Sequence, residues 1–126
     1  MKKVFVFGNR LLEGDSIALK AAEELKNKRQ SGKFEFEEIE SLNDLEEIPD
    51  ELVILDCAEG IEKIRVFADL KFLREKKNFS LHDFDLGTEL LLFEKIGKLR
   101  GKKIRIIAVP QGMPLEEAVK GVSSLL

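Results

Sequence analysis

Three residues that lie far apart in the sequence, Asp15, Asp56 and His82, carry side chains that could bind one divalent metal ion together. Two carboxylates and one imidazole suit a borderline divalent cation, and three protein ligands leave coordination positions for water or a substrate. Each residue also has a simpler interpretation. Asp15 could cap a helix, Asp56 could form a turn, and a lone loop histidine such as His82 is more often solvated. The spacing alone leaves both interpretations open, because no short motif links the three positions.

Two other places in the sequence invite a chemical interpretation that their surroundings argue against. Cys57 could act as a nucleophile, but it continues an apolar run and has no acid–base partner close in sequence, so we expect an inert core thiol. Gly8 and Asn9 also follow an apolar run. Their segment lacks both the G-x-G-x-x-G and the G-K-S/T patterns, so we expect no dinucleotide or P-loop site. A small α/β enzyme or nucleotide-binding module that shares only the architecture stays open as an alternative.

The elements that must position these residues alternate between strands and helices along the chain. Short continuous apolar runs predict strands buried on both faces, and apolar residues that alternate with charges predict a strand nearer an edge. Apolar residues at helical spacing predict amphipathic helices. The expected strands cover residues 4–7, 33–39, 52–55 and 104–109, with a short one at 64–67, and the expected helices cover 16–28, 42–45 and 86–96, with a last one beginning at Pro114. The strand at 52–55 is expected to end at Asp56.

This alternation predicts a three-layer α/β fold, with a mostly parallel, twisted sheet of about five strands and helices on both faces. The 126 residues fit one domain, so we expect a single domain over residues 1–126. In such sheets ligands bind at the carboxyl ends of the strands. Asp15 and Asp56 follow apolar strands, and His82 lies in the loop before the helix at 86–96, so all three satisfy this positional requirement.

Composition and charge exclude several classes of function. The net charge is −3 and acidic and basic residues are interleaved, so no basic face predicts a nucleic-acid partner. The single cysteine cannot form a disulfide within the chain, which favours a reducing compartment. The apolar run at residues 4–7 is too short for a signal peptide, and no stretch is long enough to cross a bilayer. We therefore expect a cytoplasmic monomer without a membrane partner.

Residues 8–18 resemble the first loop of the hydrogenase maturation endopeptidases. In that family a buried strand runs into a loop of the form G-N-x-L-x-x-D-D/E-x-x-G. The matching positions here are Gly8, Asn9, Leu11 and Asp15, whereas Gly14 and Ala18 stand where the family has an acidic residue and a glycine.

Three later segments are similar to further landmarks of this family and follow in the same order. Residues 52–58 resemble the family's middle strand, which ends in an Asp-Ala pair, and they place Asp56 at the aspartate position. Residues 80–90 resemble its serine–x–histidine loop, which precedes a glycine and a leucine-rich helix, with His82 at the histidine position. Residues 105–110 resemble its strand that ends in a proline.

The resemblance implies a phosphorylase/hydrolase-like fold and a nickel site. The family's nickel-binding positions fall on Asp15, Asp56 and His82, which would serve both as metal ligands and as catalytic residues. The implied activity is that of a metal-dependent endopeptidase that removes the C-terminal extension of a nickel–iron hydrogenase large-subunit precursor. The metal would be nickel carried by the substrate or bound at the site, or another divalent ion.

Residues 40–45 depart from the family at a place where it usually has a Gly-Thr-rich loop implicated in substrate choice. This segment contains no glycine. The departure leaves open a second interpretation, in which the chain is a non-catalytic relative that binds nickel or docks on the precursor without cleaving it.

Overall fold

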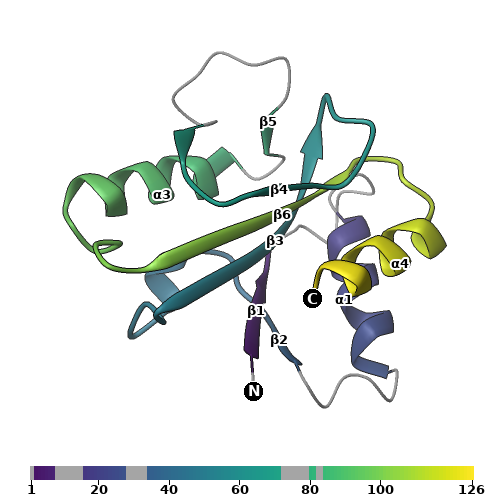
Figure 1. Ribbon diagram of the computed structural model, residues 1–126, viewed down its shortest axis with the longest axis horizontal. Coiled ribbons are helices and arrows are strands. Elements are labelled where there is room, and N and C mark those ends of the chain that lie inside the picture. The colour runs from purple at the N-terminus through teal and green to yellow at the C-terminus, as the bar shows by residue number, and fades with distance from the viewer. Residues whose placement is uncertain (1, 8–15, 28–33, 72–79, 82–83) are drawn as a thin grey trace.

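The computed structural model describes residues 2–7, 16–27, 34–71, 80–81 and 84–126 (Figure 1). The strands are β1 (Lys2–Val6), β2 (Phe34–Glu38), β3 (Glu51–Glu59), β4 (Arg65–Phe67), β5 (Ser80–Leu81) and β6 (Lys103–Pro110). The helices are α1 (Ser16–Asn27), the short 3₁₀ helix η2 (Leu42–Asp44), α3 (Phe84–Lys95) and α4 (Leu115–Leu125).

The strands form a mixed sheet in the order β2-β1-β3-β6-β4, and β5 pairs with β3 outside this path. The pairs β1–β2, β1–β3 and β3–β6 are parallel, whereas β4 runs antiparallel to β6 and β5 antiparallel to β3. The prediction of a mostly parallel sheet is confirmed. The alternating sequence of residues 33–39 also predicted its place correctly, because β2 lies at an edge of the sheet.

Helices cover both faces of the sheet, as predicted. Helices α1 and α4 pack against each other and against one face, and α3 covers the other face (Figure 1). Successive side chains of a strand point to opposite faces, so β3 contributes to both cores. Its residues Val53, Leu55 and Cys57 join the core under α1 and α4, whereas Leu52, Ile54 and Ala58 join the core under α3.

The middle strand is longer than its apolar run predicted. We expected it to end at Asp56, but β3 continues to Glu59. The extension is held on both sides, because Ala58 pairs with Pro110 of β6 and also with Leu81 of β5. Asp56 therefore lies within a strand and not in a turn.

The other expected elements agree with the structure to within a few residues. The weak pattern at 64–67 corresponds to β4, and the expected helix at 42–45 is the single turn η2. The helix expected at 16–28 is described as far as Asn27. No described helix is long and apolar enough to cross a membrane. That residues 1–126 form one domain stays a prediction.

Candidate metal centre

Asp56 is the one polar or charged residue that is buried in the described part of the chain, with 1% of its surface exposed. Moving a carboxylate from water into a protein interior costs several kcal/mol unless other groups compensate. Because burial is costly, a carboxylate that is buried within a strand is a candidate functional residue. The sequence analysis selected the same residue from its position after an apolar run.

Among the described residues, one edge of β3 has no paired strand at Asp56 and Cys57. Strand β1 pairs with β3 only as far as Leu55, where the Phe7 N–H donates to the Leu55 carbonyl oxygen at 2.9 Å. Strand β5 pairs with β3 from Ala58 onward, and the other edge of β3 is occupied by β6. Asp56 and Cys57 therefore lie between the end of β1 and the start of β5, at the carboxyl end of a parallel strand, where α/β sheets bind ligands.

Asp56 and its neighbour Cys57 face opposite layers. The Cys57 thiol points to the layer of α1 and accepts a hydrogen bond from the backbone N–H of Ala18, with an N···Sγ distance of 3.4 Å. Because side chains alternate along a strand, Asp56 points to the same side as Ile54 and Ala58, which belong to the core under α3. The carboxylate thus lies on the side of the sheet that carries the helix after His82.

The thiol of Cys57 is suited to packing and not to nucleophilic attack. Burial raises its pKa from the ordinary value of 9.0 to about 12, and the negative charge of Asp56 contributes to the rise. The backbone N–H groups of Ala18 and Ile17 oppose the rise only in part. The thiol is protonated at neutral pH, and the thiolate is the reactive form. The expectation of an inert core thiol agrees with this geometry.

Asp15 and His82, the other two predicted ligands, lie outside the described residues. No group of three metal-binding side chains occurs among the residues that the structure does describe. The predicted set of Asp15, Asp56 and His82 therefore stays a prediction as a set. Of these three residues, the structure describes the position of Asp56 only.

The described residues next to Asp15 and His82 both belong to segments that meet β3 beside Asp56. Asp15 directly precedes Ser16, the first residue of α1, and α1 contacts Cys57 through Ala18. His82 directly follows Leu81, which pairs with Ala58. Both segments reach β3 within two residues of Asp56, α1 on the face opposite to the carboxylate and β5 along the strand edge.

Glu89 of α3 has a role that the sequence analysis missed. Its carboxylate accepts hydrogen bonds from the Ser41 hydroxyl at 2.7 Å and from the Leu42 backbone N–H at 2.6 Å. These bonds hold η2, the turn that follows β2, against the helix. Ser41 and Asp44 form a capping box at the start of η2, and no local pattern connects this turn with a residue 47 or 48 positions away.

Comparisons with known proteins find the fold but no sequence relative. No family model matches the chain, and no curated protein matches it. The NiFe hydrogenase maturation protease HybD from Thermococcus kodakarensis has a similar structure, with a TM-score of 0.67 and 18% identity over 99% of both chains. The hydrogenase maturating endopeptidase HybD from E. coli gives a TM-score of 0.60 and 17% identity over 100% of this chain and 92% of its own. The chain thus has the same fold as these two hydrogenase maturation proteases.

Proposed function

We propose that the chain is an endopeptidase that removes the C-terminal extension of a nickel–iron hydrogenase large-subunit precursor. The observation that carries the proposal is the convergence of α1 and β5 on β3 within two residues of the buried Asp56. The similarity to two maturation proteases over nearly the whole chain supports it. The four motifs, in the order that this family has them, support it independently.

The chemistry of the donor set fits a nickel ion that the precursor carries as part of the substrate. Asp56 would supply one carboxylate oxygen from a buried position, and Asp15 and His82 would supply a second oxygen and an imidazole nitrogen. A bound divalent ion can polarise an amide carbonyl or position a water, so it supplies Lewis-acid chemistry to peptide hydrolysis. Burial of Asp56 strengthens its attraction for a cation, because fewer water dipoles screen the charge.

A cleavage assay on nickel-loaded precursor tests the proposal. The variants Asp15→Asn, Asp56→Asn and His82→Ala are each incubated with the precursor, and the mass of the large subunit is followed in time. We expect each to slow removal of the extension by about 100-fold or more, since even outer-shell partners of metal ligands are worth about 10–100-fold. The affinity of the enzyme–precursor complex for nickel should fall in parallel. In the unmodified chain this affinity should also weaken as the pH is lowered, because the imidazole of His82 becomes protonated.

Asp50→Asn is the matched control, because it makes the same chemical change in a side chain that is 97% exposed. It precedes β3 at the end of that strand remote from Asp56. We expect it to cleave like the unmodified chain. Unchanged processing and unchanged nickel affinity in all three site variants, with folding verified by thermal melting, would show that the site assignment is wrong.

A non-catalytic relative is the second candidate, and the segment after β2 favours it. Where the family has a Gly-Thr-rich loop, this chain has a 3₁₀ turn that Glu89 fixes through Ser41 and Leu42. A binding protein of this kind would co-elute with the precursor and protect the extension from added protease. An active endopeptidase would release the extension and then dissociate from the processed large subunit. The cleavage assay on nickel-loaded precursor therefore distinguishes an endopeptidase from a binding protein.

A further inference from the structure

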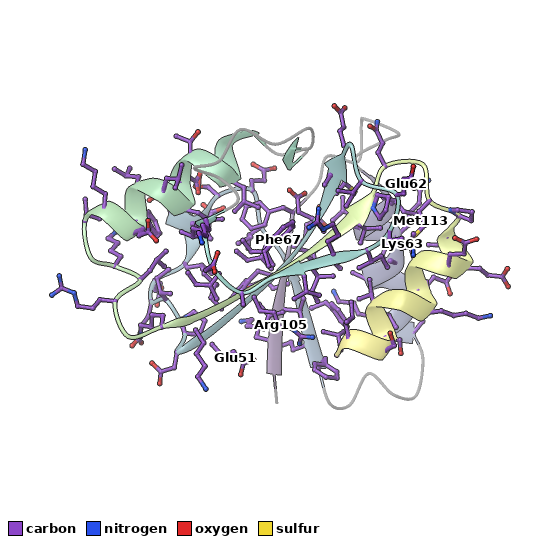
Figure 2. The ribbon with its side chains drawn as sticks, turned by 45° about the horizontal axis from the view of Figure 1, so that its top comes forward. Glu51, Glu62, Lys63, Phe67, Arg105 and Met113 are labelled. Atoms are coloured by element: carbon purple, nitrogen blue, oxygen red, sulfur yellow. The ribbon has the colours of Figure 1, made fainter. Side chains whose placement is uncertain are left out.

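A groove lies at the end of the sheet opposite to Asp56. It has a volume of about 750 Å³, and its wall consists of the first residues of β6, the end of α3 with the turn that follows, and the segment that leaves β4. Asp56 pairs with Ala108, five residues along β6 from Lys103, so the two sites are separated by roughly 16 Å along the strand. Figure 2 shows Glu51 at the groove end of β3, with Glu62 and Met113 at the other end beside α4.

The floor of the groove is an edge of β6 that no other strand of the described residues covers. Pairing between β4 and β6 stops where Phe67 meets Ile106, and the lining includes the three residues before it, Lys103 to Arg105. The side chains of these three residues alternate between the two faces of the sheet. All three can therefore line one groove only through their backbone, at the edge of the strand.

The backbone groups of Ile104 point into this groove. The Lys103 N–H donates to the Asp50 carbonyl oxygen at 2.8 Å, so the backbone of Lys103 faces β3. The backbone groups of successive strand residues face opposite edges, so the N–H and C=O of Ile104 face away from β3. No strand among the described residues pairs with Ile104 on that side. An open edge of this kind can accept an extended chain as an added strand.

The charge of the groove differs from that of the whole chain. Its lining contains five basic residues and three acidic ones, whereas the chain carries a net charge of −3. Some of these charges are engaged locally: Lys102 pairs with Asp50 at 3.0 Å, and Asp69 accepts a hydrogen bond from the Lys71 N–H at 2.9 Å. The other charged residues of the lining are the exposed cations Lys95, Arg100 and Lys103, the half-buried Arg105 and the exposed anions Glu51 and Glu94, so only a small excess of positive charge remains.

We propose that this groove binds a short, extended, acidic segment of a partner protein. The segment adds to β6 beyond the end of β4, and its backbone pairs with the N–H and C=O of Ile104. Its carboxylates lie near Lys95, Arg100 and Lys103. Charge complementarity selects an acidic segment, and the open strand edge selects an extended one. This inference does not depend on the proposed peptidase function, because the groove and Asp56 lie at opposite ends of the sheet.

Fluorescence anisotropy with labelled hexapeptides tests the proposal on the full chain. The probe alternates glutamate and valine, and one control alternates lysine and valine. A second control keeps the glutamates but carries N-methyl groups on the backbone amides that would pair with β6. We expect saturable binding of the probe alone, which weakens as salt is added, and slower hydrogen exchange at the Ile104 amide.

Charge-reversed variants locate the binding. The double variant Lys95→Glu/Lys103→Glu should bind the acidic probe about tenfold more weakly or worse. Lys20→Glu/Lys120→Glu is the matched control, because it changes the net charge equally at exposed positions of α1 and α4. We expect it to bind almost like the unmodified chain.

Three results would overturn the proposal. One is absence of saturable binding of the acidic probe up to about 1 mM, the weakest affinity that a specific peptide site would show. Another is equal weakening in the two double variants, which would mean that binding follows net charge only. The third is equal binding of the N-methylated peptide, which would mean that the edge of β6 does not pair with the ligand.

Discussion

Alkaline pH should destabilise the folded chain through one buried thiol, that of Cys57. Burial raises its pKa from 9.0 to about 12, helped by the charge of Asp56. In the unfolded chain the thiol is exposed to water and regains its ordinary pKa of 9.0. Between these two values the unfolded state has released a proton that the folded state still holds, so rising pH favours unfolding.

The size of the effect follows from the two pKa values. The stabilising contribution of the protonated thiol is complete below pH 9 and is lost as the pH rises toward 12. Each pH unit in that window is worth about 1.4 kcal/mol, so the loss is about 3 kcal/mol at pH 11 and about 4 kcal/mol at pH 12. The total stability of a small domain is about 5–15 kcal/mol, so this one group accounts for a large share.

The assay is urea unfolding under reducing conditions at pH 7, 9, 10 and 11, with Cys57→Ala as the reference. At pH 7 the variant should be less stable by roughly 1 kcal/mol, because it leaves a small cavity and loses the bond from the Ala18 N–H. The difference should shrink above pH 9 and then change sign, since only the unmodified chain carries the thiol. Contributions from all other groups are the same in both proteins and cancel in the comparison.

A difference between the two proteins that stays constant from pH 9 to pH 11 would refute this account of Cys57. It would mean that the folded thiol ionises as easily as an exposed one. The consequence for function would be direct, because a thiolate available near neutral pH would make Cys57 a candidate nucleophile again. A thiol reagent offered to the native protein at pH 8 gives a second measurement, and we expect it to react only as fast as the chain opens.

Two further predictions concern residues that hold the layers in place. Glu89→Ala should lower the free energy of unfolding by roughly 2–3 kcal/mol, because it removes the charge-assisted bonds from the Ser41 hydroxyl and the Leu42 N–H. Urea unfolding measures this loss, and Glu89→Gln should recover part of it. A loss below about 0.5 kcal/mol in Glu89→Ala would contradict the role of Glu89. Gly97 ends α3 with a positive φ of 81° and has open space around it. Gly97→Ala should therefore cost about 1 kcal/mol through backbone strain alone, with Gly97→Asn milder in the same titration, and equal stability of all three proteins would show that the turn relaxes.

The central strands were predictable because they are buried on both faces. Each of these strands contains an apolar run, at residues 4–6 of β1, 52–55 of β3 and 106–109 of β6, although Asp56 and Arg105 interrupt the pattern in β3 and β6. The end of α3 was equally clear, since Gly97 supplies the conformation that closes a helix. In β4 the signal was weak, because two of its three residues are exposed and the strand is defined by its pairing with β6.

Features that depend on contacts between distant segments were not predictable. Strand β3 extends past Asp56 because β5, a two-residue strand more than twenty positions later, pairs with Ala58 and Glu59. The bonds from Glu89 to the turn after β2 likewise join segments that no local pattern connects. The predicted metal ligands Asp15, Asp56 and His82 all remain predictions, and the structure describes the position of Asp56 alone among them.

The unequal lengths of the strands determine the surroundings of Asp56, the one buried carboxylate among the residues that the structure describes. Strand β1 ends opposite Leu55, whereas β3 and β6 continue together as far as Ala58 and Pro110. Among the described residues, no strand pairs with this edge of β3 between Leu55 and Ala58, and the carboxyl ends of parallel strands are where α/β sheets bind ligands. An apolar side chain at Asp56 would satisfy packing at lower cost than a carboxylate does. In the proposed function this carboxylate would bind a cation that the substrate brings, and the charge of that cation would compensate for the burial of Asp56.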